Sequence, residues 1–207
     1  EFGKSLVIEP YLSNVVLAGS ILDKSNFEGK VELIEGICSG SSHLSLAYVE
    51  AAHSYEYLMP DTNVSEDNKL NGTKTLVLNG KNASKLIVSC VKNDEFKLVL
   101  IDTTAEGVSF NTFKTIDEKT CAEFSFENVS IEDADIIASG DEAKNLIIEA
   151  LNLATLCVSA EAVGCMISCY QKTVQYTKER EQFDQPISNF QVLQHRMVDM
   201  FIDSELA

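Results

Sequence analysis

Residues 176–200 read YTKEREQFDQPISNFQVLQHRMVDM, and this stretch decides the fold prediction. It joins two segments with helical character, residues 140–178 and residues 189–207, which Ile187–Asn189 separates. The stretch therefore predicts two helices joined by a turn. In chain order the residues of the turn motif are Arg180, Gln182, Phe183, Asp184, Pro186, Ile187, Phe190 and Gln191.

The segment before the turn, residues 140–178, predicts one long helix with Ser139 and Asp141 as candidate N-caps. A helix of that length would span about 58 Å at 1.5 Å per residue. This is too long for a lone domain of this size, so we expect a helical bundle that extends beyond this chain. Small residues allow helices to approach closely, and they recur here as Ala154, Cys157, Ala160, Gly164, Cys165 and Ser168.

Two further regions precede this helix. Residues 1–42 are predicted to be helical, with Pro10 marking either a kink or a helix start. In residues 43–132, short apolar runs alternate with turn signals, which predicts several short strands. Phe124 and Phe126 share one face of such a strand because side chains alternate along it. The expected class is α+β, with a central antiparallel barrel or sandwich flanked by helices of an incomplete bundle.

Composition limits the classes of function. The 207 residues carry a formal net charge of −16, and this charge argues against a nucleic-acid partner because phosphates would be repelled. No continuous run of about 18 apolar residues is present, so we expect no membrane insertion. No signal peptide is recognisable, and we expect a cytoplasmic protein. The first residue is Glu1 rather than Met, and one interpretation is that the chain is a fragment of a longer protein.

The cysteines and histidines point to no metal site. None of the six cysteines forms a CxxC pair, and we interpret them as reduced core residues. His43, His53 and His195 form no evident triad with a serine or cysteine nucleophile.

The 180–191 motif resembles the start of the C-terminal helical domain of acyl-CoA dehydrogenases, where Gly stands in place of Asp184. The segments LAYVE, LNGTKTLVLNGKNASKLIVS, FENVSI and SAEAVGC also resemble family segments, so the resemblance covers essentially the whole chain. It implies the end of an N-terminal helical domain at 1–42, a middle β-domain at 43–132 and the start of a C-terminal helical domain at 133–207. Within the family, the chain resembles the small subunits of heteromeric enzymes of the pimeloyl-CoA dehydrogenase type.

The resemblance implies FAD as cofactor, held across a subunit boundary. Arg180 would pair with the pyrophosphate, for which a guanidinium is well suited. Gln182 and Gln191 would donate hydrogen bonds to the diphosphate or adenosine part, and Phe183 would pack on the adenine side. The alternative is that Arg180 belongs to a surface charge cluster with Glu179 and Glu181, and that Phe183 is a core residue.

Other positions depart from the family pattern. A flavin-contacting Thr is matched by Val49, an aromatic residue facing the ring by Leu76, and a second Thr by Leu78. The usual Gly-Ser turn is replaced around residues 51–56. The cradle for the flavin ring therefore looks degraded, although backbone amides could still bind the ring.

The family's catalytic base is also not found. Most members carry the glutamate beyond the position of Ala207, and a minority carry it at the position of Ala154, next to an Arg that Thr155 replaces here. Glu161 lies two turns further along the helix, where a structural hydrogen bond is the alternative to a role as base. We therefore assign no catalytic residue.

The resemblance implies α,β-dehydrogenation of an acyl-CoA thioester, with electron-transfer flavoprotein as acceptor and a homo- or hetero-oligomer (dimer of dimers) as assembly. Two alternatives stay open. One is a non-catalytic assembly module that keeps the fold. The other is an oxidase or monooxygenase on the same fold, because fold alone does not fix chemistry.

Overall fold

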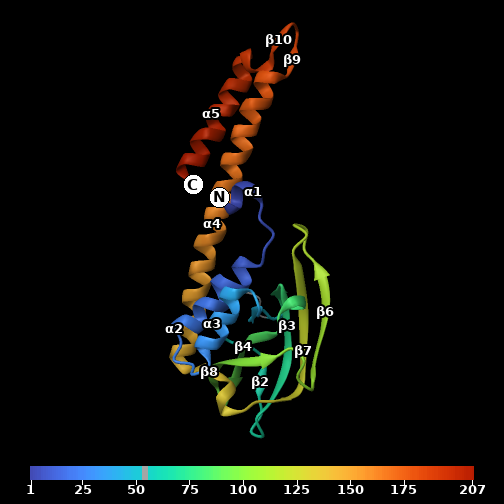
Figure 1. Ribbon diagram of the computed structural model, residues 1–207, viewed down its shortest axis with the longest axis vertical. Coiled ribbons are helices and arrows are strands. Elements are labelled where there is room, and N and C mark those ends of the chain that lie inside the picture. Colours follow the sequence, from blue (N-terminus) through green and yellow to red (C-terminus); the bar gives the residue numbers. More distant parts are fainter. Residues whose placement is uncertain (53–55) are drawn as a thin grey trace. The chain divides into compact units, whose positions relative to one another are not determined.

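The computed structural model describes residues 1–52 and 56–207, which divide into two compact units (Figure 1). The sheet unit is Pro10–Ala154, and the hairpin unit combines Glu1–Glu9 with Thr155–Ala207. The long helix α4 (Gly140–Glu179) begins in the sheet unit and ends in the hairpin unit. Both predicted domain boundaries, after residues 42 and 132, fall inside the sheet unit, and the three-domain division stays a prediction.

The sheet unit begins with helices. A π-helix, η1 (Tyr11–Gly19), starts directly after Pro10, which confirms Pro10 as a helix start. The buried Asn14 on η1 accepts a hydrogen bond from the backbone N–H of Leu44 at 2.8 Å, and so ties η1 to the first strand. The helices α2 (Ser20–Lys24) and α3 (Lys30–Ser39) follow η1.

One sheet of eight strands follows, in the order β6-β7-β3-β2-β4-β5-β8, with β1 paired beside β4. The α+β class is confirmed, but the antiparallel barrel or sandwich is corrected. Both β1 and β2 pair with β4 in parallel, and within the described residues the end strands β6 and β8 do not pair, so the sheet is mixed and open. Alternation along a strand shows which side chains share a face, but not which strand is its neighbour. The strands are β1 (Leu44–Ala47), β2 (Asn63–Val64), β3 (Lys69–Leu78), β4 (Lys85–Lys92), β5 (Glu95–Asp102), β6 (Val108–Lys114), β7 (Thr120–Ser130) and β8 (Ile136–Ser139), with short 3₁₀ helices η2 (Gly80–Asn82) and η3 (Asp133–Asp135).

One hydrophobic cluster of this unit lies on one face of the sheet. Phe124 and Phe126 share this face as predicted, and both are buried there, with ring centroids 6.3 Å apart. Val77, Leu86 and Val99 from neighbouring strands belong to the same cluster.

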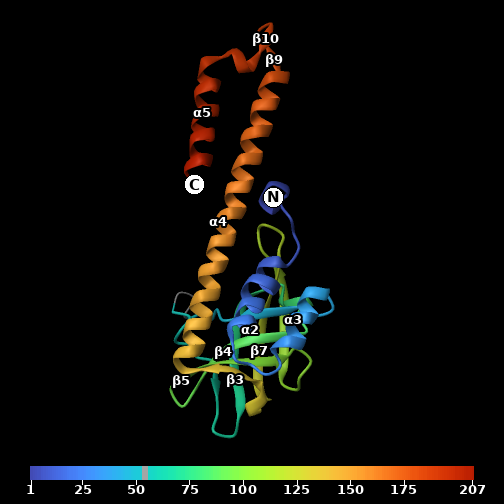
Figure 2. The same ribbon diagram turned by 60° about the vertical axis from the view of Figure 1, so that its left-hand side comes forward.

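The hairpin unit is built on two antiparallel helices. After Glu179 the chain forms a small hairpin of β9 (Glu181–Gln182) and β10 (Gln185–Pro186), then η4 (Ile187–Asn189), and returns as α5 (Gln191–Leu206) alongside α4 (Figure 2). The rings of Tyr170 and Phe201 lie 5.6 Å apart between the two helices. The Thr177 hydroxyl lies 3.3 Å from the Met197 sulfur.

The N-terminal helix α1 (Phe2–Ser5) lies against α4 through small residues. A Cβ atom on Gly3 would overlap the carbonyl oxygen of Glu161, and one on Gly164 would lie 2.9 Å from the backbone nitrogen of Lys4. The Cys165 thiol donates to the carbonyl of Gly3 at 3.2 Å. Small residues on α4 therefore allow this close contact, as the sequence predicts.

Helix α4 is more apolar than its lack of a continuous apolar run suggests. It is long and apolar enough to cross a membrane by length and composition alone, with an 18-residue window of mean hydropathy 1.7 that is 22% buried. Isolated polar residues interrupt the apolar run of α4 without lowering its mean hydropathy much, and the expectation of no membrane insertion stays a prediction. Core helices of soluble proteins pass the same test.

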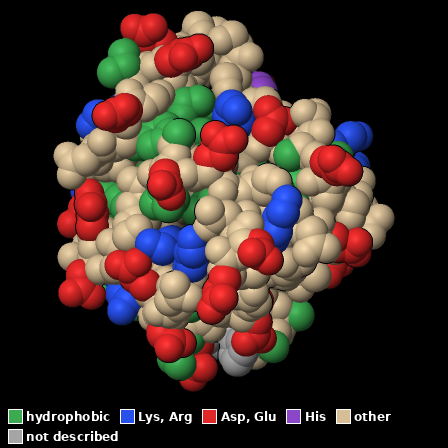
Figure 3. Space-filling model, turned by 90° about the horizontal axis from the view of Figure 1, so that it is seen from below, with side chains coloured by type: hydrophobic (Ala, Val, Ile, Leu, Met, Phe, Trp, Pro, Cys, Tyr) green, Lys and Arg blue, Asp and Glu red, His purple; other side chains and the backbone are tan. Residues whose placement is uncertain are grey.

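Much apolar surface in the hairpin unit is exposed within this chain. Leu156 on α4 is 65% exposed, and Val192 and Leu206 on α5 are 66% and 81% exposed. Such faces are typical of helices that pack against further helices, and a larger bundle stays the prediction. Charged groups show no such gathering on the face seen in Figure 3, where acidic and basic side chains are interspersed.

Candidate functional site

The motif that decides the fold prediction forms the tip of the hairpin unit. Strands β9 and β10 pair Gln182 with Gln185, and the backbone N–H of Ile187 donates to the carbonyl of Arg180 at 2.8 Å. The two residues of the turn, Phe183 and Asp184, both have left-handed backbones, with φ of 56° and 61°. Two left-handed central residues define a type I′ turn, which favours Gly, Asn and Asp. This geometry accommodates Asp184, and it would equally accommodate the Gly that the resemblance implies at this position.

Substitutions at Asp184 test this turn. Asp184→Ala is expected to destabilise the hairpin unit by about 1 kcal/mol, because a Cβ without a local polar group disfavours the left-handed region. Asp184→Gly is the matched control and is expected to be neutral or slightly stabilising. Urea unfolding followed by circular dichroism measures both. Equal effects of the two substitutions would contradict the type I′ assignment.

The predicted cofactor-binding residues lie together around this hairpin and are all exposed: Arg180, Gln182, Phe183 and Gln191. Phe183 is 85% exposed, so the alternative interpretation of it as a core residue is wrong. Its ring meets Phe190 edge to face at 6.1 Å, which fixes its direction without burying it.

The predicted alternative of a charge cluster around Arg180 is not observed either. Within residues 1–52 and 56–207 the Arg180 guanidinium makes no ion pair. The Glu179 carboxylate instead accepts a hydrogen bond from the Gln175 side chain, and the Gln182 amide donates to the carbonyl of Glu181 at 2.8 Å. Arg180 is thus an exposed cation with its hydrogen-bond donors available.

The start of α5 adds backbone donors beside these side chains. Phe190 is the N-cap residue, and no side chain caps the helix. The first N–H groups of a helix have no partner within it, and the helix dipole favours an anion there. Arg180, the two glutamines and the start of α5 together form a donor set suited to a diphosphate.

The three positions predicted to depart from the family's flavin-ring cradle lie in the sheet unit. The backbone N–H of Thr75 donates to the carbonyl of Val49 at 2.9 Å, which joins the end of β1 to β3. Leu76 is 47% exposed with a left-handed φ of 51°, and Leu78 is half-buried. Neither Val49, Leu76 nor Leu78 can donate a side-chain hydrogen bond. Residues 53–55, which include His53 and part of the replaced turn, lie outside the described residues.

Glu50 and Lys74, the chain neighbours of Val49 and Thr75, form a buried ion pair that the sequence analysis did not predict. The Lys74 ammonium lies 2.6 Å from the Glu50 carboxylate, with side-chain exposures of 0% and 6%. Glu50 also accepts from the Thr62 hydroxyl at 2.6 Å and from the backbone N–H groups of Asp61 and Thr62 at 2.7 and 3.1 Å. Lys74 donates a second bond to the Ser89 hydroxyl at 3.0 Å. The signal available in the sequence was that Lys74 shares its strand face with the core residue Leu70.

The electrostatics of this pair favour an ionised carboxylate. Burial alone raises the pKa of Glu50, but the hydrogen bonds from Lys74 and Thr62 and the Lys74 charge outweigh it and lower that pKa. Burial lowers the pKa of Lys74, which the Glu50 carboxylate opposes. Burial raises the pKa of the nearby Cys90 thiol to about 12, so Cys90 is not a competing anion.

No carboxylate is present on α4 at Ala154, the position where the resemblance implies that a minority of family members carry the catalytic base. Ala154 is buried on α4, and Thr155 beside it is exposed. Glu161 is half-buried on α4, next to the contact with α1.

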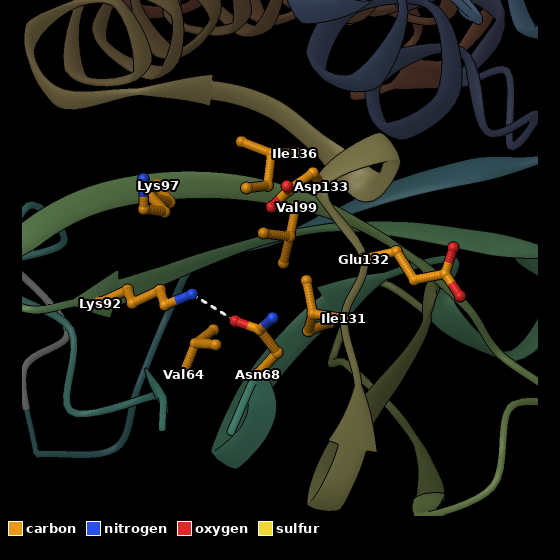
Figure 4. A pocket seen from close by; sticks show the side chains of 9 residues that line it. All are labelled: Val64, Asn68, Lys92, Lys97, Val99, Ile131, Glu132, Asp133 and Ile136. Atoms are coloured by element: carbon orange, nitrogen blue, oxygen red, sulfur yellow. Dashed lines mark hydrogen bonds between the residues drawn. The ribbon is translucent and has the colours of Figure 1, made fainter. Parts of the chain in front are cut away.

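One hollow in the sheet unit is too small for a cofactor. It has a volume of about 10 Å³, the room of about one water molecule. Lys92 donates to Asn68 across it, while Glu132 is directed away (Figure 4). In residues 1–52 and 56–207 no three His, Cys, Asp or Glu side chains form a cluster able to hold a metal ion.

Comparison with known proteins shows which family the chain is similar to. The model of the acyl-CoA dehydrogenase C-terminal domain matches residues 144–207. The 3-(aryl)acrylate reductase of Clostridium sporogenes is 27% identical over 206 residues, which cover 92% of this chain and 54% of that protein. This chain therefore spans about half the length of that relative.

Solved structures show the same fold. The ChsE4–ChsE5 complex of Mycobacterium tuberculosis matches with a TM-score of 0.85 at 24% identity, covering 99% of this chain and 55% of that one. A glutaryl-CoA dehydrogenase of Mycobacterium smegmatis in complex with FADH2 matches with a TM-score of 0.86 at 24% identity, covering 93% and 52%. Fold, domain model and relatives agree in their similarity to the acyl-CoA dehydrogenase family, whose C-terminal domain model matches residues 144–207 of this chain.

Proposed function

We propose that this chain is part of an FAD-dependent acyl-CoA dehydrogenase and that its hairpin holds the diphosphate part of FAD. The observation that carries the proposal is the exposed Arg180, which makes no ion pair within residues 1–52 and 56–207, beside the start of α5, which has no side-chain cap. In a chain of net charge −16, such an arginine is well suited to receive an anion from outside the chain.

The residues of the hairpin fit this group. Arg180 would pair with the diphosphate, Gln182 and Gln191 would donate further hydrogen bonds, and the exposed Phe183 ring offers an apolar face to the adenine side. When bound, FAD accepts the hydride from the acyl-CoA substrate, and the protein contributes binding and orientation. The proposed acceptor of the electrons is electron-transfer flavoprotein.

We further propose that the chain is one subunit of a heteromeric enzyme, similar to the small subunits of the pimeloyl-CoA dehydrogenase type. The diphosphate-binding residues are kept while Val49, Leu76 and Leu78 offer the ring no side-chain donor. This asymmetry is expected if the hairpin closes over FAD seated in a partner subunit. The relative solved as a two-protein complex supports such an assembly. The catalytic base would then come from the partner or from chain beyond Ala207.

A non-catalytic assembly module is the second candidate. The replacements at the ring cradle and Thr155 at the family's Arg position favour it, and so does the apolar surface on α4 and α5. The unpaired Arg180 and the exposed Gln182 favour the flavoprotein.

The reaction is tested on the native assembly, purified together with its partner subunit. Acyl-CoA thioesters of different chain length are added without oxygen, and the visible flavin band is followed. Bleaching by at least one acyl-CoA is the expected result, because α,β-dehydrogenation reduces the flavin. A flavin-containing assembly that no acyl-CoA bleaches would overturn the proposed reaction. Rapid oxygen consumption after bleaching would instead indicate an oxidase or monooxygenase.

A further inference from the structure

Strands β3 and β7 carry two bulges that compensate each other. From Leu70↔Val129 to Gly72↔Phe126, β7 advances by one residue more than β3. From Lys74↔Phe124 to Val77↔Ala122, β3 advances by one residue more than β7. Each bulge contains a left-handed residue, Asn128 with φ 55° on β7 and Leu76 with φ 51° on β3. The pairing of residues 72–74 is therefore displaced by one residue from the pairing on either side.

The hydrophobic pattern requires a bulge in β3 but does not fix its place. Leu70 and Val77 both face the core, yet they are an odd number of positions apart, so alternation must break once between them. The break could lie at Asn71–Gly72, where glycine adopts unusual backbone angles at little cost. It lies instead at Thr75–Leu76, where a bulky residue must adopt the left-handed region.

Lys74 explains this choice. Its side chain faces inward with Leu70 and is fully buried against Glu50 and Ser89. With the break at Asn71–Gly72, Lys74 would face outward and leave the Glu50 carboxylate buried without its partner, which is strongly unfavourable. The close packing at Gly72 also fits this arrangement of the strand. A Cβ on Gly72 would lie 2.7 Å from the Cα of Thr62, whose hydroxyl is another hydrogen-bond partner of Glu50.

We propose that Glu50 and Lys74 are positioning residues whose buried pair fixes the bulge of β3 at Thr75–Leu76. This sets the Thr75 to Val49 backbone bond and holds the Leu76 side chain outward at the edge of the cradle. What this edge meets, a flavin ring or a partner subunit, rests on the proposed function, whereas the position of the bulge does not.

The test compares Gly with Ala at position 76. At a left-handed residue Gly is favoured over Ala, whereas in an ordinary strand Ala is favoured over Gly. In the native background, Leu76→Gly is expected to unfold at higher urea than Leu76→Ala. With the pair replaced by Glu50→Gln and Lys74→Thr, the order of the two midpoints is expected to reverse. Thr is used because it is uncharged and accepts either strand face.

A conservative variant provides the control. Lys74→Arg keeps the charge facing Glu50, and the native order of Leu76→Gly above Leu76→Ala is expected to persist. The Glu50→Gln, Lys74→Thr background could fail to fold. In that case amide hydrogen exchange of Thr75 is measured in Glu50→Gln alone, and exchange faster than in the native chain is expected. An unchanged Gly–Ala order without the pair, or unchanged Thr75 exchange, would overturn the proposal. Neither measurement uses flavin, so failure here leaves the proposed function standing, and a failure to bind FAD leaves this result unaffected.

Discussion

Arg180→Ala is expected to weaken FAD binding by roughly 10- to 100-fold in the assembly purified with its partner. Hydrogen bonds to charged groups contribute about 1.5–3 kcal/mol, and 1.4 kcal/mol corresponds to a factor of ten in affinity. The loss should be specific to the cofactor, because the guanidinium makes no ion pair within the described residues. Titration of the flavin-free assembly with FAD, followed by flavin absorption, gives the dissociation constant.

Arg196 offers a matched control because it and Arg180 are the chain's two arginines and both are exposed. Arg196→Ala removes the same charge from α5, outside the β9–β10 hairpin. FAD affinity is expected to stay within about twofold, since distant exposed charges are largely screened. Equal losses for both variants would show a general charge effect. Unchanged FAD affinity in Arg180→Ala would instead favour the non-catalytic assembly module.

Lys74→Met is expected to destabilise the sheet unit by about 3–5 kcal/mol, because it leaves the Glu50 carboxylate buried without its cation. Adding Glu50→Gln should recover most of this loss, since a neutral amide needs no counter-charge. Ser89→Ala, which removes only the second bond of Lys74, should cost about 1 kcal/mol. Urea unfolding followed by circular dichroism measures all three. A loss below about 1 kcal/mol for Lys74→Met would mean that water reaches and stabilises Glu50.

The sequence predicted where helices and strands lie along the chain better than it predicted which strands pair. The predicted helices at 140–178 and 189–207 correspond to α4 and α5, because helical periodicity is a local property. The inward positions of Phe124 and Phe126 follow from the same kind of local pattern. The parallel pairing of β1 with β4 did not follow, because it joins segments far apart in the chain.

The same contrast between local and distant residues applies to the candidate site. The motif around Arg180 is contiguous, so the sequence brought its members together, and the structure shows them exposed around one hairpin. The Glu50–Lys74 pair was missed because Glu50 follows β1 and Lys74 lies on β3, far along the chain, and each is unremarkable in its own segment. The type I′ turn was also missed, since Phe183-Asp184 lacks the Gly that usually marks such a turn.

The most direct test of the central claim is the visible absorption spectrum of the purified chain, alone and co-expressed with the product of its neighbouring gene. Flavin bands in the co-purified assembly, and none in the chain alone, are the predicted result, because the hairpin contributes donors to an FAD seated in the partner. A folded co-purified assembly without flavin would contradict the claim that this chain belongs to an FAD enzyme. Flavin bands in the chain alone would contradict the shared site and show that the cradle of Val49, Leu76 and Leu78 still holds the ring.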